Sequence, residues 1–163
     1  MAVTEDSKPA SASLRSWLQT KSRTWALLFF ACYRGTGGRI TYVSPDWREV
    51  HVRVPLNWRT RNYVGTIFGG SMYGAIDPIY MIMLIKILGP GYIVWDKTAT
   101  IRFKKPGKKT LTAVFRIPVK ETEEIQRLLE TERSLDRTYT VDLVDEDGVV
   151  CATVEKTEYI RKK

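Results

Sequence analysis

The pattern of apolar and polar positions divides the chain into a helical first part, a long apolar middle and a second half made mostly of strands. Apolar residues at helical spacing predict a helix over residues 11–33 that docks on the core. The Gly35-Thr-Gly-Gly38 segment is expected to end this helix. Residues 1–10 are small and polar and are expected to form a flexible tail.

Residues 24–33 are nearly all apolar and follow several basic residues, as in the charged and apolar parts of a signal peptide. Such a short segment cannot span a bilayer, and no small-x-small cleavage site follows it. We therefore interpret the segment as the buried end of the N-terminal helix.

Two strands are predicted after this helix. Residues 39–43 form the first, which is interrupted at Pro45. Residues 48–54 form the second, and their strict alternation is typical of a half-buried antiparallel strand. The positions expected to face the core are Val50, Val52 and Val54.

The least polar part of the chain, residues 64–88, predicts a central helix buried on nearly all sides. Between Gly70 and Leu88 its only charged residues are Asp77 and Lys86, and a Gly-Pro-Gly sequence ends it. A membrane span is the competing interpretation. A central acidic residue such as Asp77 costs about 2.5–3.5 kcal/mol on insertion scales, which favours a helix in a protein core.

The second half of the chain carries strand and turn signals in succession. The predicted elements are strands over 92–103 and 111–117, a short acidic helix near 121–132, and a hairpin of strands 138–143 and 149–159 around Asp145-Glu-Asp-Gly148. A helix that is apolar all round needs a curved sheet around it. The order of elements therefore predicts an α+β fold in a single domain of residues 11–163.

Charge and cysteine content narrow the classes of function. The chain of 163 residues has a formal net charge of +8, which favours encounters with nucleic acid, membranes or phosphate-bearing small molecules. No nucleic-acid-binding motif is found, and neither nucleic acid nor a membrane is expected as a partner. Cys32 and Cys151 form no close-spaced metal or redox motif, and we expect two reduced, mostly buried thiols in a cytoplasmic protein.

The segment Asn62-Tyr-Val-Gly-Thr-Ile-Phe-Gly-Gly70, with the later Asp77-Pro78, resembles the hotdog-fold thioesterases of the phenylacetate-pathway type. Their pattern is Asn-x-x-Gly-x-x-His-Gly-Gly, followed by an acidic residue in the central helix. The match is closer still to a bacterial branch with Gly-Thr-x-Phe-Gly-Gly and Asp-Pro. The resemblance covers about residues 35–160.

This resemblance implies an antiparallel sheet wrapped around a long central helix. It also implies a homodimer whose sheets join edge to edge, often doubled to a tetramer, with active sites at the subunit interface. One position departs from the pattern, because Phe68 stands where the family has histidine. A phenyl ring cannot polarise a substrate by hydrogen bonding, so hydrolysis of an acyl-CoA and non-catalytic binding of an acyl-CoA or fatty acid both stay open.

Gly69 and Gly70 open the central helix, where unpaired amides and the helix dipole favour a developing oxyanion; the alternative is a tight turn into the helix. Gly70, Gly74 and Asp77 share one stripe of the helix, and the small residues are expected to leave a groove. Buried among apolar neighbours, Asp77 is expected to act as general base. A structural carboxylate is the alternative.

Three further candidates for the site lie outside the central helix. Asn62 is expected to orient a water, to bind a carbonyl group or to hold a turn. The resemblance places a helper hydroxyl or carboxylate of the partner subunit in the stretch Asp96–Thr100. Asp96 and Thr98 are therefore candidates for substrate binding.

A basic run follows the predicted strand 92–103. It contains Lys104, Lys105, Lys108 and Lys109. These lysines are expected to hold the phosphates of coenzyme A, as the corresponding region does in relatives, or to be a solvated edge that resists aggregation.

The remaining polar residues suggest no other chemistry. His51 is the single histidine and is expected to lie on a strand surface. No metal cluster, phosphate-binding loop, dinucleotide fingerprint or Ser-His-Asp arrangement can be read from the sequence. We therefore expect no metal or redox cofactor, and coenzyme A enters only as part of the substrate.

Overall fold

The computed structural model describes residues 31–163. The predicted tail of residues 1–10 and most of the predicted helix 11–33 lie outside the described residues. Within them, helix α2 (Ala31–Gly35) ends at the glycine-containing segment, as the sequence indicates. Gly37 has a φ of 81°, a left-handed conformation that glycine adopts without steric cost.

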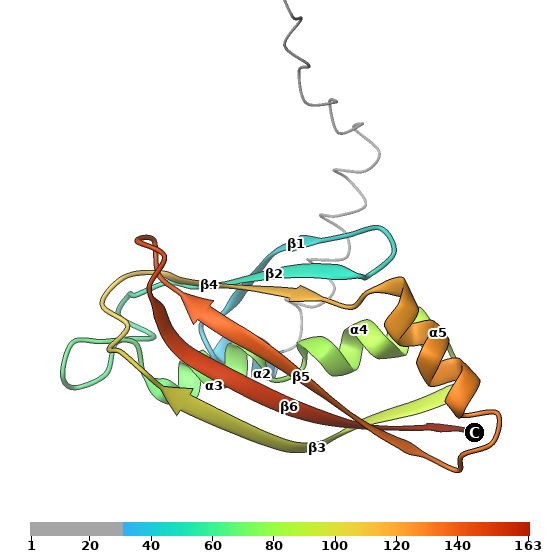
Figure 1. Ribbon diagram of the computed structural model, residues 1–163. Helices are drawn as coiled ribbons and strands as arrows, with labels where there is room; N and C mark the ends of the chain where they lie inside the picture. Colours follow the sequence, from blue (N-terminus) through green and yellow to red (C-terminus); the bar gives the residue numbers. More distant parts are fainter. Residues whose placement is uncertain (1–30) are drawn as a thin grey trace, which may run out of the picture.

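All described strands belong to one antiparallel sheet of six strands, in the order β1-β2-β4-β5-β6-β3. The strands are β1 (Arg39–Val43), β2 (Glu49–Val54), β3 (Tyr92–Phe103), β4 (Leu111–Arg116), β5 (Leu135–Val144) and β6 (Val150–Lys162). Figure 1 shows the sheet curving around the central helices, and the predicted α+β architecture is confirmed.

Side-chain alternation fixes which face of the sheet packs on the helices. On β2 and β4 every second residue faces the helices and is buried: Val50, Val52, Val54, Leu111, Ala113 and Phe115. The hairpin turn is also confirmed, because Gly148 has a φ of 79° and its N–H donates to the carbonyl of Asp145. These strands bury a continuous apolar core beneath the sheet.

The central helix begins later than predicted and is broken. Helices α3 (Gly69–Ile76) and α4 (Ile79–Leu88) are separated at Asp77 and Pro78. The prediction of helix from residue 64 is wrong, because residues 64–68 belong to a loop that Asn62 organises.

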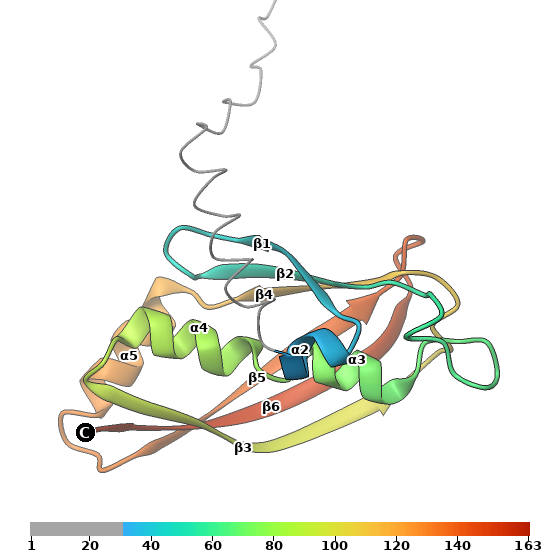
Figure 2. The ribbon, with the colours of Figure 1, turned by 180° about the vertical axis from the view of Figure 1, so that it is seen from behind.

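The stretch Gly69–Leu88 is apolar and long enough to cross a membrane by composition, with a mean hydropathy of 1.4. Half of it is buried inside the fold, which is the position of a core helix. The prediction that the central helix is buried on nearly all sides is wrong, since Ile85 and Lys86 are exposed. Figure 2 shows the sheet behind α3 and α4, with α2 beside α3 on the near side.

Strands β4 and β5 diverge and leave a wedge in the sheet. Their ladder contains the single residue pair Thr112 and Val144. Helix α5 (Val119–Leu128) lies at the wide end of this wedge (Figure 1). Arg137 of β5 forms an ion pair of 2.7 Å with Glu121 of α5, and this pair ties the wide end together.

The two cysteines are free thiols, but only Cys151 is buried. Cys32 is exposed, so the expectation that both thiols are mostly buried is wrong for this residue. It lies in α2, one residue before the buried Tyr33.

Candidate active site

The start of helix α3 lies between two exposed phenyl rings. A Cβ atom added to Gly70 would lie 2.4 Å from the ring of Phe68, and one added to Gly69 would lie 2.8 Å from the ring of Phe103. Both rings are more than half exposed, at 57% for Phe68 and 58% for Phe103. The start of the helix is therefore flanked by apolar rings, and apolar surroundings strengthen the attraction of helix amides for a developing negative charge.

A pocket of about 600 Å³ lies beside this helix start. Its apolar walls include Ile67, Met72 and Phe103, and Gly69 reaches into it. Three of the four predicted lysines line its rim: Lys104, Lys105 and Lys108. Lys109 is not part of the pocket and forms an ion pair with Asp147 instead.

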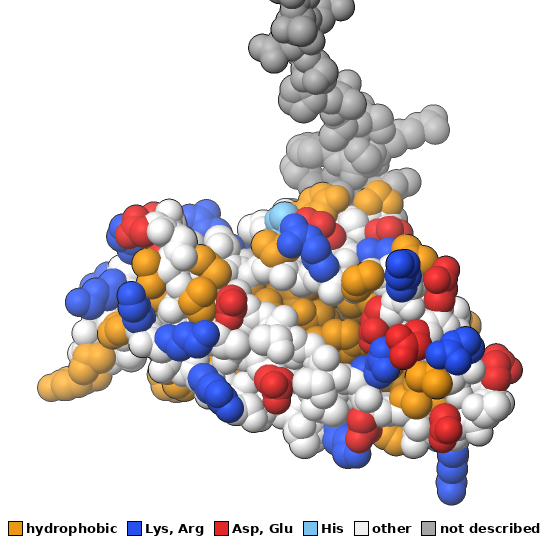
Figure 3. Space-filling view, in the orientation of Figure 1, with side chains coloured by type: hydrophobic (Ala, Val, Ile, Leu, Met, Phe, Trp, Pro, Cys, Tyr) orange, Lys and Arg blue, Asp and Glu red, His pale blue; other side chains and the backbone are white. Residues whose placement is uncertain are grey.

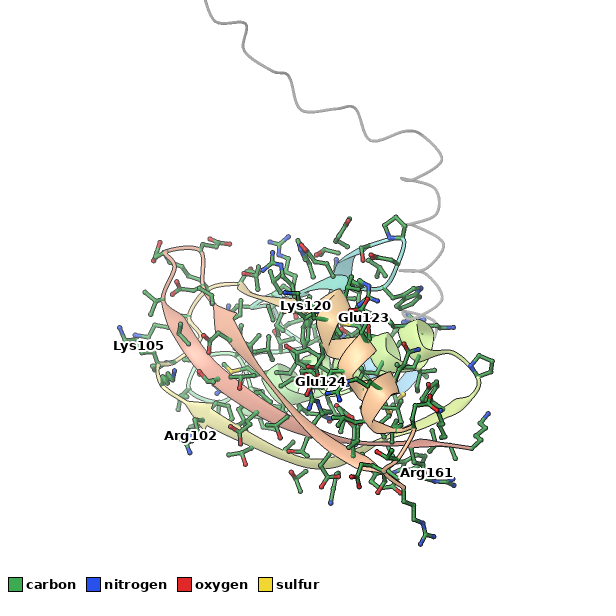
Figure 4. The ribbon with its side chains drawn as sticks, turned by 45° about the vertical axis from the view of Figure 1, so that its right-hand side comes forward. Arg102, Lys105, Lys120, Glu123, Glu124 and Arg161 are labelled. Carbon is green, nitrogen blue, oxygen red and sulfur yellow. The ribbon has the colours of Figure 1, made fainter. Side chains whose placement is uncertain are left out.

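The end of the molecule that carries the pocket is basic and apolar at once. In Figure 3, Lys and Arg side chains gather there beside a protruding apolar loop. The most exposed apolar residues of that loop are Trp58, Tyr63 and Val64. Figure 4 shows Arg102 and Lys105 projecting outward at this end, far from Arg161 at the other.

Asn62 lines the pocket, but its carboxamide group is already engaged. Oδ1 accepts hydrogen bonds from the N–H groups of Val64 (3.1 Å) and Thr66 (2.9 Å). Nδ2 donates to Oγ1 of Thr66 at 2.9 Å. Of the roles expected for this residue, the structure displays the one of holding a turn.

Asp77 lies at the break between α3 and α4, and its side chain is 39% exposed. It is therefore less buried than its apolar neighbours in the sequence indicate. Oδ1 accepts a hydrogen bond of 2.6 Å from the hydroxyl of Tyr73 and one of 2.8 Å from Nζ of Lys156. A carboxylate anchored by one oxygen in this way has a defined orientation.

A second carboxylate contacts the same lysine. Nζ of Lys156 lies 2.6 Å from Oδ1 of Asp96, although no hydrogen bond of good angle reaches that oxygen from the described residues. Across the ladder, Asp96 of β3 pairs with Glu158 of β6. Thr98, the other candidate on this strand, is exposed beside an irregularity in the ladder.

Glu158 is fully buried, and neither carboxyl oxygen has a hydrogen-bond partner within residues 31–163. Burial, and then the neighbouring carboxylate of Asp96, raises the pKa of Glu158 to about 8. At neutral pH this residue therefore carries its proton. Burial and the hydrogen bond to Asp77 raise the pKa of Tyr73 to about 12, so the phenol stays a donor.

Sequence reasoning missed Lys156, Glu158 and Tyr73. A signal for the first two was present, because alternation along the last strand places both on its inward face between Val154 and Ile160. Charged residues at inward positions of a strand are rare unless they are paired or functional. Tyr73 carries no such signal, since it is a half-buried aromatic residue in an apolar helix.

The predicted groove along Gly70, Gly74 and Asp77 is not open along its length. A Cβ atom added to Gly74 would lie 2.9 Å from Cγ2 of Thr36, so the segment after α2 packs there. The ring of Phe68 covers the position of Gly70 in the same way. The small residues serve close packing, and this part of the prediction is wrong.

His51 lies on β2, where Nε2 is 2.6 Å from Oε1 of Glu49 and the ring packs against Tyr42. It is far along the sheet from β3, at the other edge. In the part of the chain that the structure describes, no group of three His, Cys, Asp or Glu residues could hold a metal ion.

Solved structures with the same fold include several thioesterases. PA5026 of Pseudomonas aeruginosa, a protein of unknown function and probable thioesterase, superimposes with a TM-score of 0.78 at 17% identity, over 88% of this chain and 96% of its own. Thioesterase HI1161 of Haemophilus influenzae gives a TM-score of 0.66 at 15% identity, over 88% of this chain and 90% of its own. The PaaI protein of the E. coli phenylacetic acid degradation operon gives a TM-score of 0.60 at 16% identity, over 89% of this chain and 93% of its own.

These similarities establish the hotdog fold, as the sequence motif implies. A search of curated proteins gives no match. The family model of the domain of unknown function DUF4442 matches residues 20–160, which is most of the chain. With its motif, its fold and this match, the chain belongs to the DUF4442 family.

Proposed function

We propose that the protein is a cytoplasmic acyl-CoA thioesterase that works as a homodimer or a larger homo-oligomer. The observation that carries this proposal is the pocket at the start of α3, where apolar walls, the backbone of Gly69 and a rim of lysines meet. An acyl-CoA needs these three environments: one for the acyl chain, one for the thioester oxygen and one for the phosphates.

In the proposed reaction, Asp77 takes a proton from a water whose oxygen attacks the thioester carbonyl carbon. The amides of Gly69 and Gly70 stabilise the negative oxygen of the tetrahedral intermediate. The carbon–sulfur bond then breaks, and the proton passes to the departing thiolate, which leaves as coenzyme A. The other product is the carboxylic acid. Lys104, Lys105 and Lys108 hold the phosphates during these steps.

The distance between these groups supports a site shared by two subunits. Gly70 and Asp77 are seven residues apart, which corresponds to about 10 Å along a helix. A thioester carbonyl held at the amide of Gly70 is beyond the reach of a water on Asp77 of the same chain. A second copy that brings its own Asp77 close to this helix start completes the site.

Strand β3 offers the surface for such pairing. It is an edge strand of the sheet, twelve residues long, with an exposed Trp95. A long edge strand with exposed apolar side chains is a template for pairing with another chain. Pairing of two β3 strands continues the sheet across the dimer and brings Thr98 close to the interface.

A non-catalytic acyl-CoA or fatty-acid binding protein is the second candidate. The observation in its favour is Phe68, whose ring lies against Gly70 and which stands where the thioesterase pattern that this sequence resembles has histidine. This ring adds apolar contact for an acyl chain and supplies no hydrogen bond. A protein of this kind would bind the same ligands in the same pocket without turnover.

Steady-state release of coenzyme A thiol from a panel of acyl-CoA thioesters separates the two candidates. Turnover by the wild type, reduced roughly 100- to 10,000-fold in Asp77→Asn with ligand binding retained, supports the enzyme, since this is the usual worth of a general base. Asp142→Asn, a change at an exposed aspartate of β5, is the matched control. Binding without turnover on any thioester contradicts the enzyme and favours the binding protein.

A further inference from the structure

Lys156 is a lysine in the core of the fold. It projects from the inward face of β6 and is 1% exposed. An ammonium group loses several kcal/mol of hydration when it is buried, and buried ion pairs are often replaceable by apolar residues without loss of stability. Stability alone therefore does not account for a lysine at this position.

The contacts of Lys156 converge on the candidate base. Its ammonium group bridges Oδ1 of Asp77 at 2.8 Å and Oδ1 of Asp96 at 2.6 Å. The hydroxyl of Tyr73 donates to the same Oδ1 of Asp77 at 2.6 Å. Among the described residues no group donates to Oδ2 of Asp77, and the side chain is partly open to solvent.

We propose that Lys156 is a positioning residue for Asp77: with Tyr73 it fixes Oδ1, so that Oδ2 is the oxygen that faces the reacting water. This inference rests on the proposed function and adds to it the group that orients the base. Asp96 holds the ammonium group from the other side, so Lys156 cannot swing away from the helix break. The role of Asp96 is then structural within one chain, in addition to any contact with the substrate.

The charges around Lys156 fit this role. Burial works to lower the pKa of the ammonium group, but the carboxylates of Asp77 and Asp96 outweigh it and raise the pKa above its ordinary value. Lys156 therefore stays charged. Besides Asp77, Asp96 and Tyr73, Glu158 also faces Lys156. It carries a proton at neutral pH and does not compete with Asp77 for the ammonium group.

The variant Lys156→Met tests the proposal, since methionine has a similar shape and no charge. We expect kcat to fall roughly 10- to 100-fold with little change in KM, because a displaced catalytic group costs about 100-fold. Tyr73→Phe removes the other anchor and is expected to give a smaller fall with the same split between kcat and KM.

Lys162→Met is the matched control. Lys162 lies on the same strand and forms an ion pair of similar length with Glu130, but it is partly exposed at the end of the sheet. Its kcat and KM are expected to equal those of the wild type. If Lys156→Met fails to fold, Tyr73→Phe alone decides, because Tyr73 is half-buried and its ring is retained.

An active wild type with unchanged kcat in Lys156→Met and Tyr73→Phe overturns the inference and leaves the proposed function standing. An inactive wild type overturns the proposed function instead. In that case the crystal structure of Lys156→Met still decides on the inference. A displaced Asp77 carboxylate supports it, and a carboxylate in its original position overturns it.

Discussion

Replacing Glu158 by glutamine is expected to stabilise the protein at alkaline pH and to change little at acidic pH. Glu158 is completely buried and its pKa is raised from 4.5 to about 8, by burial first and then by the carboxylate of Asp96. Below the unfolded pKa both states carry the proton. As the pH rises, the unfolded chain releases the proton first, so the free energy of unfolding falls until the folded protein also ionises.

The size of the effect follows from the shift. One pKa unit corresponds to about 1.4 kcal/mol, so a shift from 4.5 to about 8 corresponds to an upper limit on the order of 5 kcal/mol. This loss accumulates between about pH 4.5 and pH 8 and is constant above that range. Glutamine has the shape of the neutral acid and does not titrate.

Urea denaturation of the wild type and Glu158→Gln at pH values from 5 to 9 measures the difference. We expect the two free energies of unfolding to diverge as the pH rises, with the variant the more stable at pH 8 and above. Glu155→Gln is the control, because Glu155 is an exposed residue of the same strand. Curves that stay parallel across this range would refute the reasoning, since they would show that Glu158 titrates normally in the folded protein.

Three further predictions concern the pocket and the helix packing. Changing Lys104, Lys105 and Lys108 to serine is expected to weaken coenzyme A binding roughly tenfold in calorimetry and to flatten its salt dependence; Lys109→Ser, outside the pocket, is the control. Phe68→His is expected to raise kcat for acyl-CoA hydrolysis, since it places a hydrogen-bonding ring against Gly70; an unchanged kcat contradicts this role. Gly38→Ala is expected to lower the free energy of unfolding by about 1–3 kcal/mol, because its Cβ atom would lie 2.5 Å from that of Ala75; an unchanged urea midpoint would show that the helix yields.

The strands were predictable from sequence because alternation is a local property. Val50 and its neighbours on β2 show the period of two that a half-buried strand requires, and the structure buries the expected face. The start of the central helix was misplaced because residues 64–68 are as apolar as the helix itself. Their loop is set by the carboxamide of Asn62 and by Gly65, whose φ is 82°.

The candidate site was predictable only in part. Gly69, Gly70 and Asp77 lie within one short stretch, so their spacing and the family motif identify them together. Lys156 is 79 residues from Asp77 in sequence, and its contact with Asp77 depends on how β6 lies over the helix break. The pairing of Asp96 with Glu158 likewise depends on the strand order, which places β3 beside the last strand of the chain. Pattern along the chain carries no information on that order.

The wedge between β4 and β5 has a consequence for how the protein opens. With one residue pair joining them, β1-β2-β4 and β5-β6-β3 are nearly separate ladders on a shared core. Cooperative units of this kind release their amide protons independently in hydrogen exchange. The second ladder contains both Lys156 and Asp96, so we expect their ion pair to persist through fluctuations that open the first. Helix α5, which follows β4 in the chain and is tied to β5 by the Arg137–Glu121 pair, then links the two ladders at the wide end of the wedge.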